Sequence, residues 1–134
     1  MKSSSGFTSL SGIARFALKP LLAAILILLP AAILNSQPVW VPTTPSLGPA
    51  GPTTIPINYG IDRAGTVYII ALNYNNPNQQ TPATVRGQAI NPTLPSVVFN
   101  AVIPIAGANI NAILQAIAGS LAPGTYHTIY LVAA

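Results

Sequence analysis

The chain has 134 residues, about the length of one domain, and only 4% of them are charged, against roughly 25% in an ordinary soluble domain. It has one Asp, no Glu, one His and no Cys. This composition offers no carboxylate pair for acid–base catalysis, no thiol nucleophile and no cluster of metal ligands. We therefore expect no enzymatic activity, no catalytic or cofactor-binding residue and no metal site.

Most of the positive charge lies near the N-terminal end. Lys2, Arg15 and Lys19 precede the first long apolar run. The rest of the chain carries two arginines and one aspartate, a net charge of +1, in Arg63, Arg86 and Asp62. Isolated arginines do not make the basic surface typical of nucleic-acid-binding proteins, so we expect no nucleic-acid partner.

Residues 1–36 have the three-part layout of a secretory signal peptide: a basic start, a short apolar centre over residues 20–34 and a polar exit at Asn35 and Ser36. A helix that spans a bilayer needs ~20 apolar residues, more than this centre supplies. We expect a hydrophobic helix here and cleavage after Ser36, which predicts a secreted or cell-surface protein. The alternative is a retained N-terminal membrane anchor, and in either case contact with a membrane is confined to this segment.

Residues 37–54 predict a proline-rich extended linker, because prolines recur from Pro38 to Pro52 and each fixes φ and lacks a backbone donor. Such a segment is typical of a semi-rigid spacer. Val39, Trp40 and Val41 form an apolar cluster within it, so an alternative is a strand that pairs along the open edge of another subunit. We expect Trp40 itself to pack on its own domain.

Residues 55–134 predict one β-sandwich domain. Strands are expected, from their β-branched and aromatic residues, over residues 55–61, 66–73, 96–103 and 125–133. Pro56 indicates an edge strand for the first of them. Apolar side chains on both faces indicate a central strand for the second. In the third, every second side chain from Val97 to Ile103 is expected on one face.

Two short helical segments are expected between these strands. Residues 81–87 predict a helical turn, with Thr81 as its cap and Pro82 in its first position. Residues 109–118 predict an inserted helix that packs between the strands, because its large apolar residues recur with helical spacing. These are Ile110, Ile113, Leu114 and Ile117.

Three separated stretches resemble one pattern, that of the fibronectin type III-like and immunoglobulin-like modules of bacterial cell-surface proteins. They are residues 62–68 (DRAGTVY), residues 81–88 (TPATVRGQ), and residues 121–125 (LAPGT) with 130–133 (YLVA). The resemblance implies a mostly β protein, a small antiparallel β-sandwich that serves as a spacer, stalk or adhesive unit without catalysis. His127 stands where the pattern has a Tyr whose hydroxyl ties a corner to upstream backbone. Tyr126 stands one place earlier, so the alternatives are that a ring N–H of His127 makes this contact or that the register slips by one residue.

The leading functional hypothesis is a non-enzymatic exported structural module that self-associates, or binds other cell-surface proteins, through edge strands and the proline-rich segment. A net charge near zero leaves little repulsion between copies. Open strand edges must be paired or protected. With so few charges available, protection is expected from Pro56, Pro95 and Pro104.

The alternative hypothesis is an adhesion module that binds carbohydrate or protein through exposed aromatic rings. Aromatic faces stack on sugars, and the polar loop over residues 74–80 offers amide hydrogen bonds. The residues expected to do this are Trp40, Tyr59, Tyr68 and Tyr74. A calcium site is not expected in that loop because it has no carboxylate.

Overall fold

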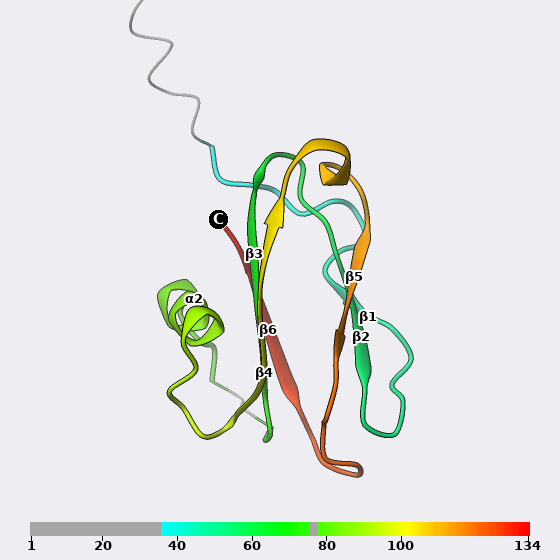
Figure 1. Cartoon of the computed structure of the whole chain (residues 1–134), viewed down its shortest axis with the longest axis vertical. Helices are drawn as coiled ribbons and strands as arrows, with labels where there is room; N and C mark the ends of the chain where they lie inside the picture. Colours follow the sequence, from blue (N-terminus) through cyan, green and yellow to red (C-terminus); the bar gives the residue numbers. More distant parts are fainter. Residues whose placement is uncertain (1–35, 76–77) are drawn as a thin grey trace, which may run out of the picture. The chain divides into compact units, whose positions relative to one another are not determined.

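Two antiparallel three-stranded sheets pack together in the computed structural model, which describes residues 36–75 and 78–134 (Figure 1). The strands are β1 (Ser46–Leu47), β2 (Ile55–Tyr59), β3 (Gly65–Leu72), β4 (Val97–Ile105), β5 (Leu114–Ala118) and β6 (Thr128–Ala133). One sheet has the order β1-β2-β5 and the other β4-β3-β6. The predicted mostly β, two-sheet architecture is confirmed.

The predicted N-terminal hydrophobic helix, as a signal peptide or a membrane segment, lies outside the described residues. Within residues 36–75 and 78–134, no helix is long and apolar enough to cross a membrane. Residues 37–134 form one compact unit, which contains both sheets.

β3 is the central strand of its sheet, as its two apolar faces predict, and pairs with β4 on one side and β6 on the other. Ile69 is fully buried in the inter-sheet core, the cluster that Ile57, Tyr59, Ile61, Val67, Ile69, Ile105, Ala118 and Leu121 form between the sheets. Ile70 is equally buried on the opposite face, in a second cluster with Leu72, Val85 and Ala89. Successive side chains of a strand point to opposite faces, so β3 holds both clusters together.

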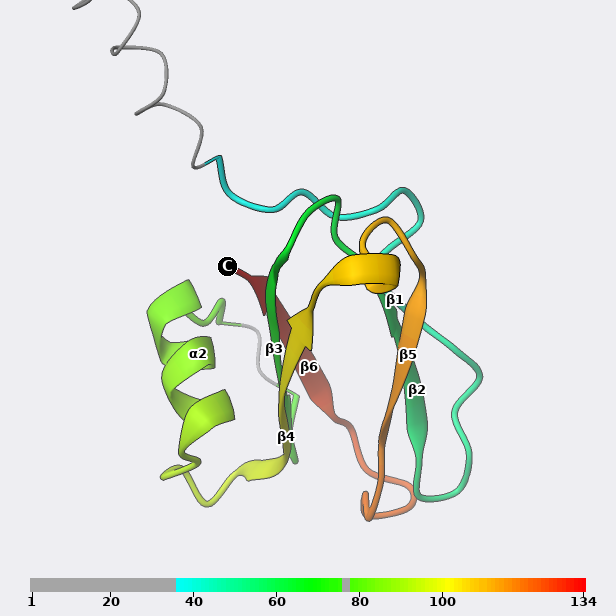
Figure 2. The same ribbon diagram turned by 45° about the horizontal axis from the view of Figure 1, so that its top comes forward.

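Helix α2 (Pro82–Ile90) covers the outer face of the β4-β3-β6 sheet (Figure 2). Its start follows the sequence prediction: the hydroxyl of Thr81 accepts a hydrogen bond from the backbone N–H of Thr84 at 3.2 Å, and Pro82 begins the helix. Val85 and Ala89, one turn apart, are buried against the sheet. The side chain of Asn100 donates to the carbonyl oxygen of Ala89 at 2.8 Å and so caps a backbone group in the last turn.

A β-bulge in β4 puts Val97 on the opposite face of the sheet from the one predicted. Phe99, Ala101 and Ile103 point to the inter-sheet core as expected. Val97 instead packs with the cluster under α2. The register shifts where Leu72 pairs with Val97 while Ala71 pairs with Phe99, which leaves one extra residue in β4. An inserted residue turns every preceding side chain to the other face.

The edge position predicted for the first strand is wrong, because β2 lies between β1 and β5. Pro56 is tolerated there for a local reason. The backbone N–H of Gly48 donates to the carbonyl oxygen of Pro56 at 2.8 Å, so the backbone of Pro56 faces the β1 side. β1 ends at Leu47, and the donor that Pro56 lacks therefore falls beyond the end of a two-residue strand.

The helix predicted over residues 109–118 is also wrong. The chain forms a short 3₁₀ turn, η2 (Gly107–Asn109), and then β5, which pairs with β2 along its whole length. Leu114, Ala116 and Ala118 face the core, whereas Ile117 is 58% exposed. Asn111 has a φ of 60°, which no α-helix contains. The apolar spacing of this segment fits a helix by coincidence. The segment forms a strand because it pairs with the edge of β2 that β1 does not occupy.

Residues 37–54 are part of the folded unit rather than a spacer in front of it. The backbone N–H of Val41 donates to the carbonyl oxygen of Gly60 at 2.9 Å, and that of Asp62 donates to Val39 at 3.0 Å. Trp40 forms a β-bridge with Ile61 and packs against the inter-sheet core, as expected for an anchor on its own domain. The prolines shape turns within this docked segment.

Two glycine substitutions test this packing. A Cβ on Gly60 would overlap the carbonyl oxygen of Ala112 and lie 3.2 Å from Cγ2 of Val41. We expect Gly60→Ala to lower the free energy of unfolding of residues 37–134 by about 1–3 kcal/mol. A Cβ on Gly87, inside α2, meets no atom within 4 Å. Gly87→Ala is the control, and we expect it to raise stability by about 0.5–1 kcal/mol because alanine favours helix. Urea unfolding measures both, and equal effects would contradict this packing.

Candidate interaction surface

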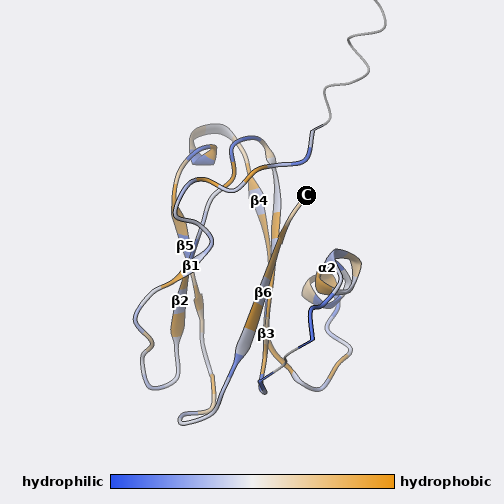
Figure 3. Cartoon of the chain, turned by 180° about the vertical axis from the view of Figure 1, so that it is seen from behind, coloured by the Kyte–Doolittle hydropathy of each residue, from blue (hydrophilic) through white to orange (hydrophobic). Residues whose placement is uncertain are grey.

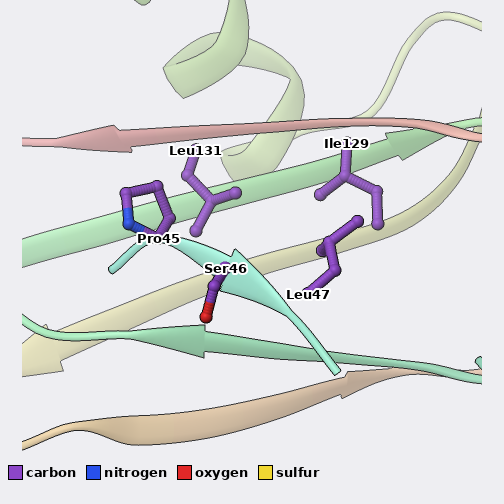
Figure 4. Close-up of a pocket in the computed structure, with 5 residues that line it drawn as sticks. All are labelled: Pro45, Ser46, Leu47, Ile129 and Leu131. Atoms are coloured by element: carbon purple, nitrogen blue, oxygen red, sulfur yellow. The ribbon is translucent and has the colours of Figure 1, made fainter. Parts of the chain in front are cut away.

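An apolar groove of about 220 Å³ opens between β1 of one sheet and β6 of the other. Its lining is Pro45, Ser46, Leu47, Ile129 and Leu131, and we call it the β1–β6 groove. The side chains of Ile129 and Leu131 point from β6 towards Pro45 and Leu47 (Figure 4). Leu47 pairs with the buried Ile57 and so faces inward, yet it is 57% exposed. The groove is therefore an incompletely covered margin of the inter-sheet core.

The hydrogen-bonding edge of β6 lies beside this groove. β6 pairs with β3, and no other described strand pairs with it. Thr66 and Ala134 exchange both backbone hydrogen bonds, at 2.7 and 3.0 Å. Because bonded residues alternate along an antiparallel strand, Ile129, Leu131 and Ala133 direct their backbone N–H and C=O groups to the other edge. These groups form an open template for a further strand.

The edges of the two sheets differ in their protection. β4 contains Pro104 opposite Thr66, at a position whose backbone faces away from β3, so this edge lacks a donor, as predicted. β1 has two residues only. Pro56 and Pro95 lie elsewhere, in the middle strand β2 and in the turn before β4. β6 has neither a proline nor a charged residue, and it is hydrophobic over most of its length (Figure 3).

The aromatic residues proposed for carbohydrate binding do not gather on one face. Tyr59 is only 4% exposed in the inter-sheet core, where burial raises the pKa of its hydroxyl. Trp40 packs against that core, and Tyr68 packs against the cluster under α2. Tyr74 is the exposed member of the set. Sequence reasoning did not select Tyr126, which is 80% exposed.

His127 ties together the corner where the chain enters β6. Its Nδ1 lies 3.2 Å from the carbonyl oxygen of Leu72, at the end of β3. Its Nε2 lies 2.9 Å from Oγ1 of Thr125 and 3.3 Å from the carbonyl oxygen of Ala122. Of the two alternatives, the structure has the imidazole in contact with upstream backbone. Thr125 also donates its own hydroxyl to the carbonyl oxygen of Ala122 at 2.7 Å, so these groups form one hydrogen-bonded cluster at the corner.

Asp62 fastens the N-terminal segment to the turn between β2 and β3. Its Oδ1 accepts hydrogen bonds from the backbone N–H of Val39 and from Nε of Arg63, both at 2.9 Å. Oδ2 forms an ion pair with Nη2 of Arg63 at 2.6 Å. These hydrogen bonds, that of Arg63 foremost, lower the pKa of Asp62 from 3.8 to about 2. Sequence alone did not reveal this role, because Val39 and Asp62 meet only in the fold.

No protein-family model, no curated protein and no solved structure matches this chain. Among residues 36–75 and 78–134, no group of three or more metal-ligating side chains is placed to hold a metal ion. The candidate interaction surface is therefore described by the β1–β6 groove and the free edge of β6.

The role of Asp62 predicts acid sensitivity in a narrow range. A lowered pKa means that ionised Asp62 stabilises the fold at neutral pH, and that this stabilisation is lost as the pH falls from about 4 to 2. Asp62 is the only acidic side chain in the chain. We expect Asp62→Asn to abolish most of the difference between urea midpoints measured at pH 5 and pH 2. An unchanged difference would show that other groups cause it.

The role of His127 predicts a local loss of stability. We expect His127→Ala to lower the free energy of unfolding by about 1 kcal/mol, because it removes the imidazole hydrogen bonds at this corner while Ala122 keeps the hydroxyl of Thr125. Tyr126→Ala, one residue away and at an exposed position, is the control and should leave stability nearly unchanged. Urea unfolding followed by circular dichroism measures both variants. If His127→Ala left the free energy of unfolding unchanged, the imidazole contacts would not stabilise the fold.

Proposed function

We propose that this chain is a non-enzymatic, exported structural module that self-associates through the edges of its strands. The observation that carries the proposal is the unprotected edge of β6 beside an apolar groove. An exposed, uncharged edge strand is a template for pairing with another chain. A protein whose function requires a monomer is expected to protect such an edge.

The distribution of charge supports the same proposal. The charged side chains of the folded unit are Asp62, Arg63 and Arg86, and the first two neutralise each other in an ion pair. Arg86 lies on α2, on the far side of the β4-β3-β6 sheet from the core. Copies of this unit therefore approach one another with little electrostatic repulsion.

The sequence suggests that the proline-rich segment pairs with another subunit, but we do not assign it that role. Val39, Trp40 and Val41 already pair with the β2–β3 region of their own chain. Backbone groups of Val39 and Val41 are hydrogen-bonded to Gly60 and Asp62, so self-association uses the free edge of a regular strand in preference to this segment.

We further propose that the module is of the fibronectin type III-like or immunoglobulin-like kind found on bacterial surfaces. The support is the order of the three sequence stretches, the packing of two antiparallel sheets and the tie made by His127 at the corner before β6. Export is proposed from the layout of residues 1–36 alone. The proposed location is the cell surface or the medium.

Sedimentation velocity on residues 37–134 tests the proposal, since this unit contains the whole described core. We expect concentration-dependent species larger than a monomer at micromolar concentration. Raising the salt concentration should leave them intact, because the contact is apolar and not ionic. A monomer at every concentration up to about 100 µM would refute self-association.

A further inference from the structure

We propose that β6 pairs antiparallel with β6 of a second copy of this chain, centred on Leu131, so that two three-stranded sheets join into one. This inference rests on the proposed function and identifies its contact surface. The residues whose backbone groups face the free edge are Ile129, Leu131 and Ala133. They are evenly spaced about Leu131, so the edge is complementary to itself under a two-fold rotation.

The register follows from this spacing. Leu131 pairs with the same residue of the second copy, and Ile129 pairs with Ala133 in both directions. Every backbone group that these residues direct outward then has a partner. On the opposite face, the same register sets Tyr130 beside Val132 of the second copy, and an aromatic residue beside a β-branched one is a favourable cross-strand pair.

The groove supports a second copy as the occupant. With the sheets joined in this way, the core-facing side chains of both β6 strands lie on the same side of the joined sheet. Leu131 of each copy then lies opposite its equivalent and Ile129 lies opposite Ala133, with the exposed Leu47 on the same side of the joined sheet. The groove lining contains no charged side chain, so its natural complement is another apolar, uncharged edge of the same kind.

The other edges are less suited to such a joint. β4 lacks a donor at Pro104 and bends at its bulge, and β1 offers two residues. β5 is the remaining edge, and its outward-facing Ile117 is 58% exposed, close to the 57% of Leu47. These two residues therefore form a matched pair that distinguishes a joint at the β1–β6 groove from one at the outer face of β5.

The first experiment compares Leu47→Lys with Ile117→Lys in residues 37–134. We expect Leu47→Lys to raise the dissociation constant of the dimer by about tenfold or more, because a charge then stands in the apolar groove beside the joint. Ile117→Lys adds the same charge at an equally exposed position and should leave the constant within about twofold of the wild type. Sedimentation velocity and circular dichroism measure association and folding of each variant.

The second experiment uses the absence of cysteine from the chain. Paired residues of antiparallel strands have Cα atoms about 5.5 Å apart, a distance that a disulfide spans. We expect Leu131→Cys to form a covalent dimer under mild oxidation. Ile117→Cys, on the outer face of β5, should stay monomeric on a non-reducing gel.

The outcomes separate this inference from the proposed function. A wild-type unit that stays monomeric refutes both, and a second copy is then not the occupant of the groove. Association that survives Leu47→Lys and is lost in Ile117→Lys leaves the proposed function intact but moves the joint to β5 and overturns this inference. Loss in Leu47→Lys together with a Leu131→Cys dimer supports the β6 joint.

Discussion

Burial of both faces of β3 is the constraint on which the rest of this structure depends. Ile69 on one face and Ile70 on the other are each removed from solvent. The first requires a second sheet opposite, which β2 and β5 supply, and the second requires α2. A strand with two apolar faces cannot lie at the surface of a molecule, so the three layers follow from one segment of eight residues.

Because charged residues are scarce, uncharged hydroxyl and amide groups and one imidazole make contacts that ion pairs often make in other proteins. Thr81 caps the start of α2, Asn100 satisfies a carbonyl group near its end, and His127 ties the corner before β6. Asp62 and Arg63 form an ion pair at a turn, and Asp62 also holds the N-terminal segment. This arrangement keeps the fold satisfied internally while leaving its strand edges without electrostatic protection.

The unequal lengths of the strands produce the feature that we connect with function. β1 has two residues and β6 has six, so the first sheet ends before it covers the side chains of the second. Leu47, Ile129 and Leu131 stay partly exposed for this reason. The groove is therefore a consequence of core packing at an open margin, and the side chains that stabilise the monomer are also those of the proposed contact.

The sequence by itself determined the elements whose signals are local. The apolar run of β3, the cap and first proline of α2, and the anchoring of Trp40 could be predicted because each depends on neighbouring residues or on a single side chain.

Tertiary structure alone decided the features that depend on partners distant in the chain. Residues 109–118 have the apolar spacing of a helix, and only the free side of β2 makes part of them a strand. Pro56 indicates an edge, but a two-residue neighbour that ends beside it allows a middle strand. Three further features also depend on distant partners: the bulge that turns Val97, the docking of residues 37–54, and the groove between β1 and β6. Each joins segments far apart in sequence, and their pairing is selected by the burial of the whole core, which no local pattern encodes.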